Sequence, residues 1–418
     1  MIQYTVKPPQ KLNADIDLPA SKSISNRALI IHALSGGKII PQNLSDCDDT
    51  EVIINALNNM PDVIDIKAAG TAMRFMTAYL SVTPGEHTLT GTERMKHRPI
   101  GVLVNALRQL GADITYLGEE GYPPLRIRGS QLSGGHIEIP GDISSQFISA
   151  LLMIGPILTN GLELKMTGNI ISHPYIDLTL WTMREFGANA DWTAGDTVSV
   201  KPQPYTHREY YIENDWSASS YWYEMVAMCK DEDATIRFTG LMDGSKQGDS
   251  VVRYLFSMLG VKTQFESTQK GELTTVTLQK NRRFVPRLDY DFVNSPDLAQ
   301  TVVVCCALMG VPFHFRGLAS LRIKETDRLK ALQTELRKLG YVIEERNHSE
   351  LIWSGERCEP SNEPIDTYED HRMAMSFAPI ACCIPEVVIN NPQVVSKSYP
   401  RYWQDLQKAG FIIETSEK

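Results

Sequence analysis

Residues 19–29 read Pro-Ala-Ser-Lys-Ser-Ile-Ser-Asn-Arg-Ala-Leu, and the interpretation of the chain starts from this stretch. Apolar residues then recur at helical spacing up to Leu34, which places the polar cluster at a helix N-terminus. Unpaired amides and the positive dipole end of a helix favour an anion there. Lys22 and Arg27 would add full charges, and Ser23 a hydroxyl. An ordinary serine-capped helix with a solvated basic face would give the same pattern, so support must come from other stretches.

The composition is that of a globular protein with room for two or more domains. The chain has 418 residues, 42% hydrophobic and 22% charged, with a net charge of −9. The acidic balance indicates no nucleic-acid partner and no anionic membrane surface. Met1–Lys11 lacks the apolar core of a signal peptide, and the most apolar run, Val302–Met309, is too short to span a bilayer. We therefore expect a cytoplasmic enzyme or binding protein.

The seven cysteines predict neither a disulfide framework nor a metal site. Cys305–Cys306 and Cys382–Cys383 lie inside apolar runs, where reduced core residues are expected. None of the spacings between cysteines is typical of metal ligands.

An amphipathic helix that ends near a glycine and is followed by a strand recurs along the chain. The five copies are Leu103–Gly111, Leu180–Gly187, Val252–Gly260, Leu332–Gly340 and Trp403–Gly410. Their closing glycines follow one another at intervals of about 70 to 80 residues, and each is expected to take the left-handed position after its helix. Glu51–Met60 resembles a sixth copy without the glycine. Six such units predict two α/β domains of three units each, with a boundary within Tyr205–Asp215.

Further predicted helices of the first half begin with polar or basic residues. Gly70 would let a ligand approach the backbone closely, and Arg74 lies one turn into the same helix. Arg98 stands beside the proline that starts the next helix. The neutral donors Ser144, Ser145 and Gln146 begin a third helix, and Ser172 and Tyr175 begin a fourth. Helix capping and solvated charged loops would explain each stretch taken alone.

The second half contains the most informative stretch, Leu321–Arg328, which packs three basic and two acidic residues before a helix. Lys324 stands next to Glu325, which pairs a cation with a proton carrier, and we expect Lys324 and Arg328 to share one helix face. A solvated helix start with internal ion pairs is the alternative. Asp297 precedes another apolar helix.

Eight cations thus stand at predicted helix starts: Lys22, Arg27, Arg74, Arg98, Lys324, Arg328, Arg372 and Lys397. In an acidic chain this distribution predicts a strongly anionic ligand with more than one phosphate or carboxylate. Walker-type, Rossmann, zinc and serine-hydrolase motifs are absent from the sequence.

In this order, these stretches resemble the 5-enolpyruvylshikimate-3-phosphate synthases, which belong to the enolpyruvyl transferases. The matching segments are LPASKSISNRALI, SDCDDTEVIINAL, AAGTAMR, RMKHRPIGVLVNALRQLGA, GDISSQFISALLM, SHPYIDLTL, SPDLAQT, RIKETDRL, EDHRMAMSFA and SKSYPRYW. The resemblance implies an α/β fold of two similar domains, each of three βαβαββ units (an inside-out α/β barrel), with the active site in the interdomain cleft. It places a first, shikimate 3-phosphate-binding domain at residues 18–213, and a second, discontinuous domain at residues 1–17 and 214–418.

The resemblance also implies a reaction, in which the enolpyruvyl group of phosphoenolpyruvate passes to the 5-hydroxyl of shikimate 3-phosphate. Phosphate is released through a tetrahedral intermediate, with no metal or other cofactor. By motif position, Asp297 would take the hydroxyl proton with the help of Lys324, Glu325 would protonate C3 of phosphoenolpyruvate, and Lys22 would lie between both substrates. We expect a monomer whose partners are these two small molecules.

The same resemblance implies two sets of binding residues. The shikimate 3-phosphate set is Lys22, Ser23, Arg27, Ser144, Ser145, Gln146, Ser172, Tyr175, Asp297 and Lys324. The phosphoenolpyruvate set is Lys22, Gly70, Arg98, Gln146, Arg328, Arg372 and Lys397.

Four positions depart from the family pattern: Ala68, Phe75, Trp216 and Ser320. Ala68 and Phe75 flank the phosphoenolpyruvate loop and therefore bear on the affinity for that substrate and for glyphosate, whereas Ser320 bears on one hydrogen bond to shikimate 3-phosphate. All the expected proton-transfer groups are present, which favours an active enzyme.

Two alternatives remain. The sister enzymes that act on UDP-N-acetylglucosamine share the fold but typically carry a cysteine in the loop that here spans Thr92–Pro99 without one. A non-catalytic anion-binding protein would keep the cations but could lose Asp297 or Glu325.

Overall fold

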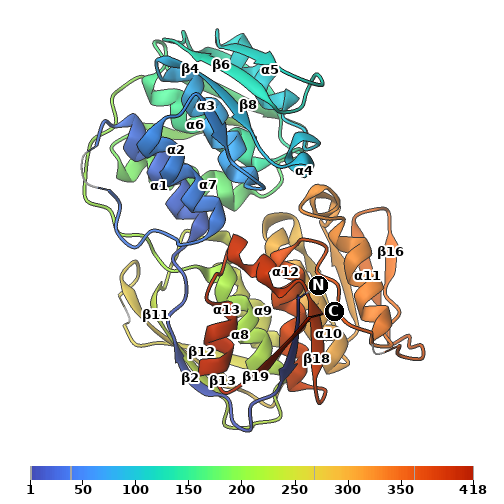
Figure 1. Cartoon of the computed structure of the whole chain (residues 1–418). Coiled ribbons are helices and arrows are strands. Elements are labelled where there is room, and N and C mark those ends of the chain that lie inside the picture. Colours follow the sequence, from blue (N-terminus) through green and yellow to red (C-terminus); the bar gives the residue numbers. More distant parts are fainter. Residues whose placement is uncertain (1, 38–39, 268, 362, 418) are drawn as a thin grey trace. The chain divides into compact units, whose positions relative to one another are not determined.

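The computed structural model describes residues 2–37, 40–267, 269–361 and 363–417. The chain divides into two compact units, which Figure 1 shows in sequence colours. The inserted unit is Ala20–Ile212, and the terminal unit combines Met1–Pro19 with Glu213–Lys418. The domain limits expected from the resemblance lie within two residues of these divisions.

Four-stranded sheets with one repeated topology build both units. In each, the first two strands are parallel, and the fourth strand lies between the second and the third, antiparallel to both. The inserted unit has two such sheets, β3-β4-β6-β5 and β7-β8-β10-β9. Their strands are β3 (Val63–Asp65), β4 (Gly85–Thr90), β5 (Asp113–Tyr116), β6 (Leu125–Gly129), β7 (Gly135–Pro140), β8 (Leu162–Thr167), β9 (Ala190–Ala194) and β10 (Thr197–Val200).

The terminal unit repeats the topology in the sheets β2-β11-β13-β12 and β14-β15-β17-β16. Their strands are β2 (Asn13–Ile16), β11 (Thr235–Met242), β12 (Val261–Phe265), β13 (Leu273–Lys280), β14 (Leu288–Asp291), β15 (Phe313–Arg316), β16 (Glu344–Arg346) and β17 (Glu350–Trp353). In the first of these sheets, β2 pairs with β11 although the whole inserted unit lies between them in the sequence.

A third sheet of the terminal unit joins the two ends of the chain. Strand β1 (Ile2–Lys7) lies between β18 (Val387–Asn390) and β19 (Ile412–Glu417), antiparallel to both. A parallel bridge between Ile365 and Ile389 marks the position of a first strand. The repeat is therefore complete only because the N-terminal strand takes the place of the fourth strand.

Two main helices accompany each repeat. Those of the inserted unit are α1 (Lys22–Leu34), α2 (Asp48–Asn59), α3 (Gly70–Val82), α5 (Gly101–Gln109), α6 (Ser145–Ile154) and α7 (His173–Glu185), and the four-residue helix α4 (Glu93–Lys96) precedes α5. Those of the terminal unit are α8 (Trp216–Met228), α9 (Val252–Met258), α10 (Ala299–Met309), α11 (Arg328–Lys338), α12 (His371–Phe377) and α13 (Tyr402–Lys408).

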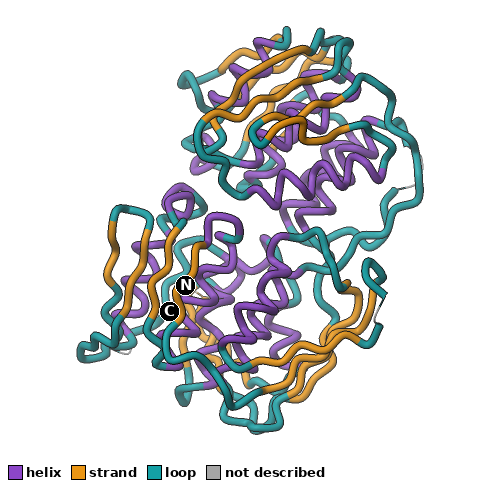
Figure 2. The backbone as a smooth tube through the Cα atoms, turned by 180° about the vertical axis from the view of Figure 1, so that it is seen from behind, coloured by secondary structure: helices purple, strands orange, loops and turns teal. Residues whose placement is uncertain are grey.

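Each unit has its own hydrophobic core, built by helices that pack on one another. Helices α6, α8 and α10 are buried almost all round, as expected for helices that are apolar on every face. In the terminal unit the strands lie outside and the helices between them (Figure 2). This arrangement is the inside-out α/β class that the resemblance implied.

The predicted glycine repeat is confirmed. Gly111, Gly187, Gly260, Gly340 and Gly410 all have positive φ angles, between 82° and 104°, directly after the second helix of their repeats. In the sixth copy Met60 takes this conformation, with φ 38°. Within the described residues, however, the repeat of α1 and α2 has a single parallel bridge, Gln42–Tyr211, in place of a four-stranded sheet.

The remaining expectations about the whole chain concern cysteines and membranes. All seven cysteines are free; Cys358 and Cys383 are half-buried, and the other five are buried. Within the described residues, acidic, histidine and cysteine side chains form no group of three that could hold a metal ion. A search of the same residues finds no helix with the length and apolar character needed to cross a membrane.

Candidate active site

Arg27 is the most deeply buried cation at the helix starts of the inserted unit, with 2% of its surface exposed. Its guanidinium donates to the hydroxyls of Thr179 at 2.7 Å and Ser149 at 3.1 Å, and to the carbonyl oxygens of Ser23 and Tyr175. All four acceptors are neutral. Burial lowers the pKa of Arg27 to about 10, because these contacts do not offset the loss of hydration. Among the described residues, no carboxylate pairs with Arg27, so its positive charge at the starts of α1 and α7 is uncompensated there.

Lys22 is the first residue of α1, whose N-cap Ser21 accepts a hydrogen bond from the amide of Ile24. Its Nζ lies 3.3 Å from Oδ2 of Asp49, which is in the first turn of α2. The sequence motif around Asp49 was part of the resemblance, but the pairing with Lys22 was not expected. A negative counter-charge therefore already stands beside this lysine.

The start of α3 is tied to the segment before α5 by two arginines. A Cβ added to Gly70 would lie 2.6 Å from Nη1 of Arg98, so the absence of a side chain lets the guanidinium rest on the backbone. Arg74 is only 4% exposed and donates to the carbonyl oxygens of Gly70 and Pro99, both at 3.1 Å. Both acceptors are neutral, as they are for Arg27, so the part of Arg74 in binding an anion stays a prediction.

The neutral donors also occupy helix starts. Ser144 caps α6 and accepts a hydrogen bond from the amide of Gln146 at 3.3 Å. Gln146 in turn donates to Thr71 Oγ1 at 3.2 Å, which joins the first turns of α6 and α3. Ser145 is buried beside them. Thr71 lies inside the motif AAGTAMR, but no spacing in the sequence predicted this contact.

At the fourth start, Ser172 is the N-cap of α7 and has left-handed backbone angles, with φ 54°. Its carbonyl oxygen accepts a hydrogen bond from the amide of Tyr175 at 3.0 Å. Ser172 is buried and Tyr175 half-buried. Together, the contacts of Arg27, Arg98 and Gln146 bring the starts of α1, α3, α6 and α7 into one region of the inserted unit.

In the terminal unit, Arg328 at the start of α11 is surrounded by carboxylates. Its Nε and Nη2 donate to the two oxygens of Asp370 at 2.7 and 3.2 Å, Nη2 also donates to Glu325 at 2.9 Å, and Nη1 contacts Asp297 at 3.4 Å. Burial lowers the pKa of Arg328, but the three carboxylates outweigh burial and raise it above the ordinary arginine value.

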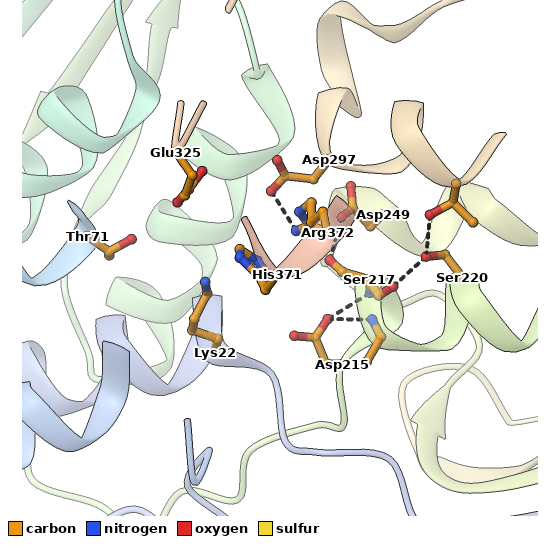
Figure 3. A network of polar contacts seen from close by, with 12 residues as sticks. Lys22, Thr71, Asp215, Ser217, Ser220, Asp249, Asp297, Glu325, His371 and Arg372 are labelled. Atoms are coloured by element: carbon orange, nitrogen blue, oxygen red, sulfur yellow. Dashed lines mark hydrogen bonds and ion pairs between the residues drawn. The ribbon is translucent and has the colours of Figure 1, made fainter. Parts of the chain in front are cut away.

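Arg372, in α12, also binds Asp297, the candidate base. Its Nη2 lies 3.0 Å from Oδ2 of Asp297, and its Nη1 donates to Tyr221 at 3.2 Å. Asp297 precedes α10 in the short helix η4 (Pro296–Leu298), so helices α10, α11 and α12 all contribute to its surroundings. Figure 3 shows Asp297 beside Arg372. Asp370 caps α12 and orders this group, accepting from the amide of Arg372 at 2.9 Å.

Glu325 is held between two cations. One oxygen accepts from Arg328 at 2.9 Å, and the other lies 2.9 Å from Nζ of Lys397. Lys397 was expected to start the last helix, but it ends the short helix η7 (Pro392–Lys397), and α13 begins only at Tyr402. The proline at residue 400 explains the interruption, because a helix rarely continues through the residue that precedes a proline.

Lys324 is half-buried between the short helix η5 (Ala319–Ile323) and α11. The expected helix face shared by Lys324 and Arg328 is wrong, because α11 begins at Arg328 with Asp327 as its N-cap. Lys324 still directly precedes Glu325 in the segment that carries the ion pairs.

The departures from the family pattern have distinct surroundings. Trp216 is fully buried, and its Nε1 donates to Glu213 at 2.8 Å. Phe75 is fully buried beneath Arg27, whose guanidinium carbon lies 5.4 Å from the ring centroid. Ala68 is exposed and Ser320 half-buried. None of the four side chains displaces a carboxylate or a cation described above.

Comparison with known proteins places this geometry in a family. The profile of the EPSP synthase (3-phosphoshikimate 1-carboxyvinyltransferase) family matches residues 6–406. A 3-phosphoshikimate 1-carboxyvinyltransferase of Bacteroides fragilis is 58% identical over 418 residues, covering all of both chains. One from Photobacterium profundum is 36% identical and covers 97% of this chain and 98% of its own.

Solved structures agree on the fold. An EPSP synthase from Acinetobacter baumannii matches 100% of both chains with a TM-score of 0.77 at 20% identity. A second structure from the same organism matches 99% of this chain and 100% of its own, with a TM-score of 0.79. With a family match over nearly its whole length and a full-length relative at 58% identity, the chain belongs to the EPSP synthase family.

Proposed function

We propose that the chain transfers the carboxyvinyl group of phosphoenolpyruvate to the 5-hydroxyl of shikimate 3-phosphate and releases phosphate. This step would serve chorismate and aromatic amino-acid biosynthesis. The observation that carries the proposal is the arrangement of two carboxyl groups among cations in the terminal unit: Asp297 between Arg328 and Arg372, and Glu325 between Arg328 and Lys397. The reaction needs a base, an acid and stabilisation of anions, and this group supplies all three.

The proposed chemistry balances through one intermediate. The substrate hydroxyl gives its proton to Asp297, assisted by Lys324, while its oxygen bonds to C2 of phosphoenolpyruvate and Glu325 protonates C3. The tetrahedral intermediate then returns a proton from C3 to Glu325 as phosphate leaves C2, which restores the double bond. Lys22 stabilises the charge on both substrates. None of these steps requires a metal or redox cofactor.

The remaining residues are proposed to bind the two substrates. For shikimate 3-phosphate, the hydroxyl and amide groups of Ser23, Ser144, Ser145, Gln146, Ser172 and Tyr175 would accompany the charge of Arg27. The neutral surroundings of Arg27 support its role in binding the phosphate group, because an uncompensated buried cation attracts an anion strongly. For phosphoenolpyruvate, Gly70 and Arg98 would act with Arg328, Arg372 and Lys397, which must then share their charge between the substrate and the carboxylates they already bind.

The test is phosphate release from phosphoenolpyruvate, measured in parallel with shikimate 3-phosphate and with UDP-N-acetylglucosamine. We expect release only with shikimate 3-phosphate. Release only with UDP-N-acetylglucosamine would assign the chain to the sister activity, and release with neither, from folded protein, would favour an anion-binding protein. An Asp297→Asn preparation serves as the blank for contaminating phosphatase.

We also expect the enzyme to act in the cytoplasm as a monomer. Sedimentation at several protein concentrations, with and without both substrates, would test the second expectation.

A further inference from the structure

A buried carboxyl group lies outside both sets of proposed site residues. Asp249, in the short helix η2 (Gly248–Val251), is only 2% exposed. Its Oδ2 accepts a hydrogen bond from Ser217 Oγ at 2.5 Å, whereas the described residues offer its Oδ1 no partner. A buried carboxyl oxygen without a hydrogen-bond partner carries a desolvation cost, and a group that carries such a cost is a candidate for a functional role.

The charged groups that face Asp249 come from three neighbouring elements: Asp215 lies at the start of α8, Asp297 in η4 and Arg372 in α12. The neutral hydroxyl of Ser217 also lies at the start of α8. The charged side chain in the first turn of α9, Arg253, instead pairs with Asp243 at 2.6 Å.

Arg372 therefore stands near two carboxyls. It contacts Asp297 at 3.0 Å, and Figure 3 shows it beside Asp249 as well. Because a guanidinium that faces a single carboxylate lowers its basicity, a second carboxylate near the same guanidinium weakens that effect. The charge of Asp249 consequently affects how readily Asp297 accepts a proton.

The state of Asp249 changes near neutral pH. Burial, followed by the negative charge of Asp297, raises the pKa of Asp249 to about 7, against the opposing effect of Arg372. Above this pH Asp249 is mostly ionised and offsets part of the charge of Arg372; below it the carboxyl is mostly neutral.

We propose that Asp249 is a positioning residue for the transfer reaction: held by Ser217, it offsets the charge of Arg372 and keeps Asp297 a competent base. The inference rests on the proposed role of Asp297. Asp249 exchanges no proton with the substrate. It acts only through the electrostatic balance of the Asp297–Arg372 pair.

Asp249→Asn removes the charge but keeps an oxygen that can accept from Ser217. We expect kcat to fall about tenfold at pH 8, while both KM values stay within about twofold, because the substitution weakens the base and not the binding groups. In the wild-type enzyme kcat should rise between about pH 6 and 8 as Asp249 ionises, and this rise should be absent from the variant. Asp249→Glu, which keeps a carboxyl group at this position, should recover part of the rise of kcat with pH.

Two measurements separate this role from a structural one. Asp405→Asn is the control, since Asp405 is a half-buried carboxyl of the terminal unit that accepts a hydrogen bond from Tyr399 in a different region. It should leave the pH profile unchanged. Carbon-13 NMR of labelled aspartate should show one carboxyl that titrates near pH 7 in the wild-type enzyme and is missing from Asp249→Asn.

The outcomes also separate the inference from the proposed function. Wild-type protein that releases no phosphate with shikimate 3-phosphate would overturn both. An active wild type whose Asp249→Asn variant keeps the full kcat and its rise with pH would overturn the inference alone. So would an Asp249 carboxyl that titrates well below pH 6.

Discussion

Two buried arginines, one in each unit, differ in the charge of the groups that accept their hydrogen bonds. Arg27 and Arg328 are exposed to only 2% and 1%. The acceptors of Arg27 are neutral hydroxyl and carbonyl oxygens, and burial lowers its pKa to about 10. Arg328 is bound by three carboxylates, and despite burial its pKa lies above the ordinary value. In the part of the chain that the structure describes, no carboxylate pairs with Arg27, whereas three carboxylates balance the charge of Arg328.

The difference indicates a division of work within the proposed reaction. An uncompensated cation in the inserted unit suits the recognition of a phosphorylated substrate. Carboxylates held among cations in the terminal unit suit proton transfer, since neighbouring charges determine when each carboxyl is ionised. Four predictions test this comparison.

The largest effect is expected from the proposed base. Asp297→Asn should lower kcat about a thousandfold, within the range typical for loss of a general base, and should change the Kd of shikimate 3-phosphate only severalfold. Rapid-quench kinetics and calorimetric titration measure the two quantities. Asp289→Asn, an exposed carboxyl on strand β14, is the control. Equal losses in catalysis and binding would make Asp297 a structural residue and would break the proposed division.

The second prediction contrasts the two arginines directly. Arg328→Met leaves Asp370 buried without its counter-charge and should lower the free energy of unfolding by about 3–5 kcal/mol. Arg27→Met should cost less than about 1 kcal/mol, because the variant also removes an uncompensated buried charge. Ser149 and Thr179 would still share a hydrogen bond at 2.8 Å.

Urea denaturation of both variants measures these costs. The Arg27 variant should nevertheless bind shikimate 3-phosphate far more weakly than the wild-type protein. Equal destabilisation by the two substitutions would show that neutral acceptors compensate an arginine as well as carboxylates do.

A third prediction concerns a buried acid that mirrors Arg27. Glu213 of the terminal unit accepts from Trp216, from the amide of Met242 and from Ser245, all neutral donors. Burial raises the pKa of Glu213 to about 7. Because the folded pKa exceeds the unfolded value, the contribution of this group to stability is complete below about pH 4 and is lost as the pH rises to about 7.

Glu213→Gln removes this titration. Relative to the wild-type protein, the free energy of unfolding of the variant should rise by about 3 kcal/mol between pH 4 and pH 8. Thermal or urea denaturation across that range measures the difference, and Glu266→Gln, an exposed carboxylate of the same unit, should show no comparable trend. A difference that stays constant with pH would mean that neutral donors are sufficient to keep Glu213 ionised.

The smallest effect is expected at the glycine beneath Arg98. A methyl group at Gly70 would lie 2.6 Å from Nη1 of Arg98 and would force that flexible side chain to move. The KM for phosphoenolpyruvate should rise about tenfold and the affinity for glyphosate should fall, with little change in stability. Gly195→Ala is the control, since an added Cβ there meets no atom within 4 Å. Unchanged values for both ligands would remove Gly70 and Arg98 from the proposed phosphoenolpyruvate site.

Much of the architecture was predictable from local patterns. The five helix–glycine segments were predictable because a helix has a fixed apolar period and glycine alone adopts positive φ at little cost. The same reasoning predicted the positions of Lys22, Gly70 and Ser145 at helix starts. The pairing of the terminal strands could not be predicted in this way. Strand β1 pairs with β18, whose residues lie more than 380 positions later in the sequence, and no local pattern indicates such a pairing.

Except at Lys324 and Lys397, the sequence by itself determined which cations and carboxyls stand at helix starts, because capping, helix period and glycine conformation depend on neighbouring residues. Only the tertiary structure decided which of these charges are balanced. Asp370 meets Arg328 across 42 positions, and Asp297 meets it across 31. Arg74 donates to the carbonyl oxygens of Gly70 and Pro99, and the second of these contacts joins segments that no local pattern relates. Counter-charges are set by which helix ends pack together, and that packing depends on the whole core.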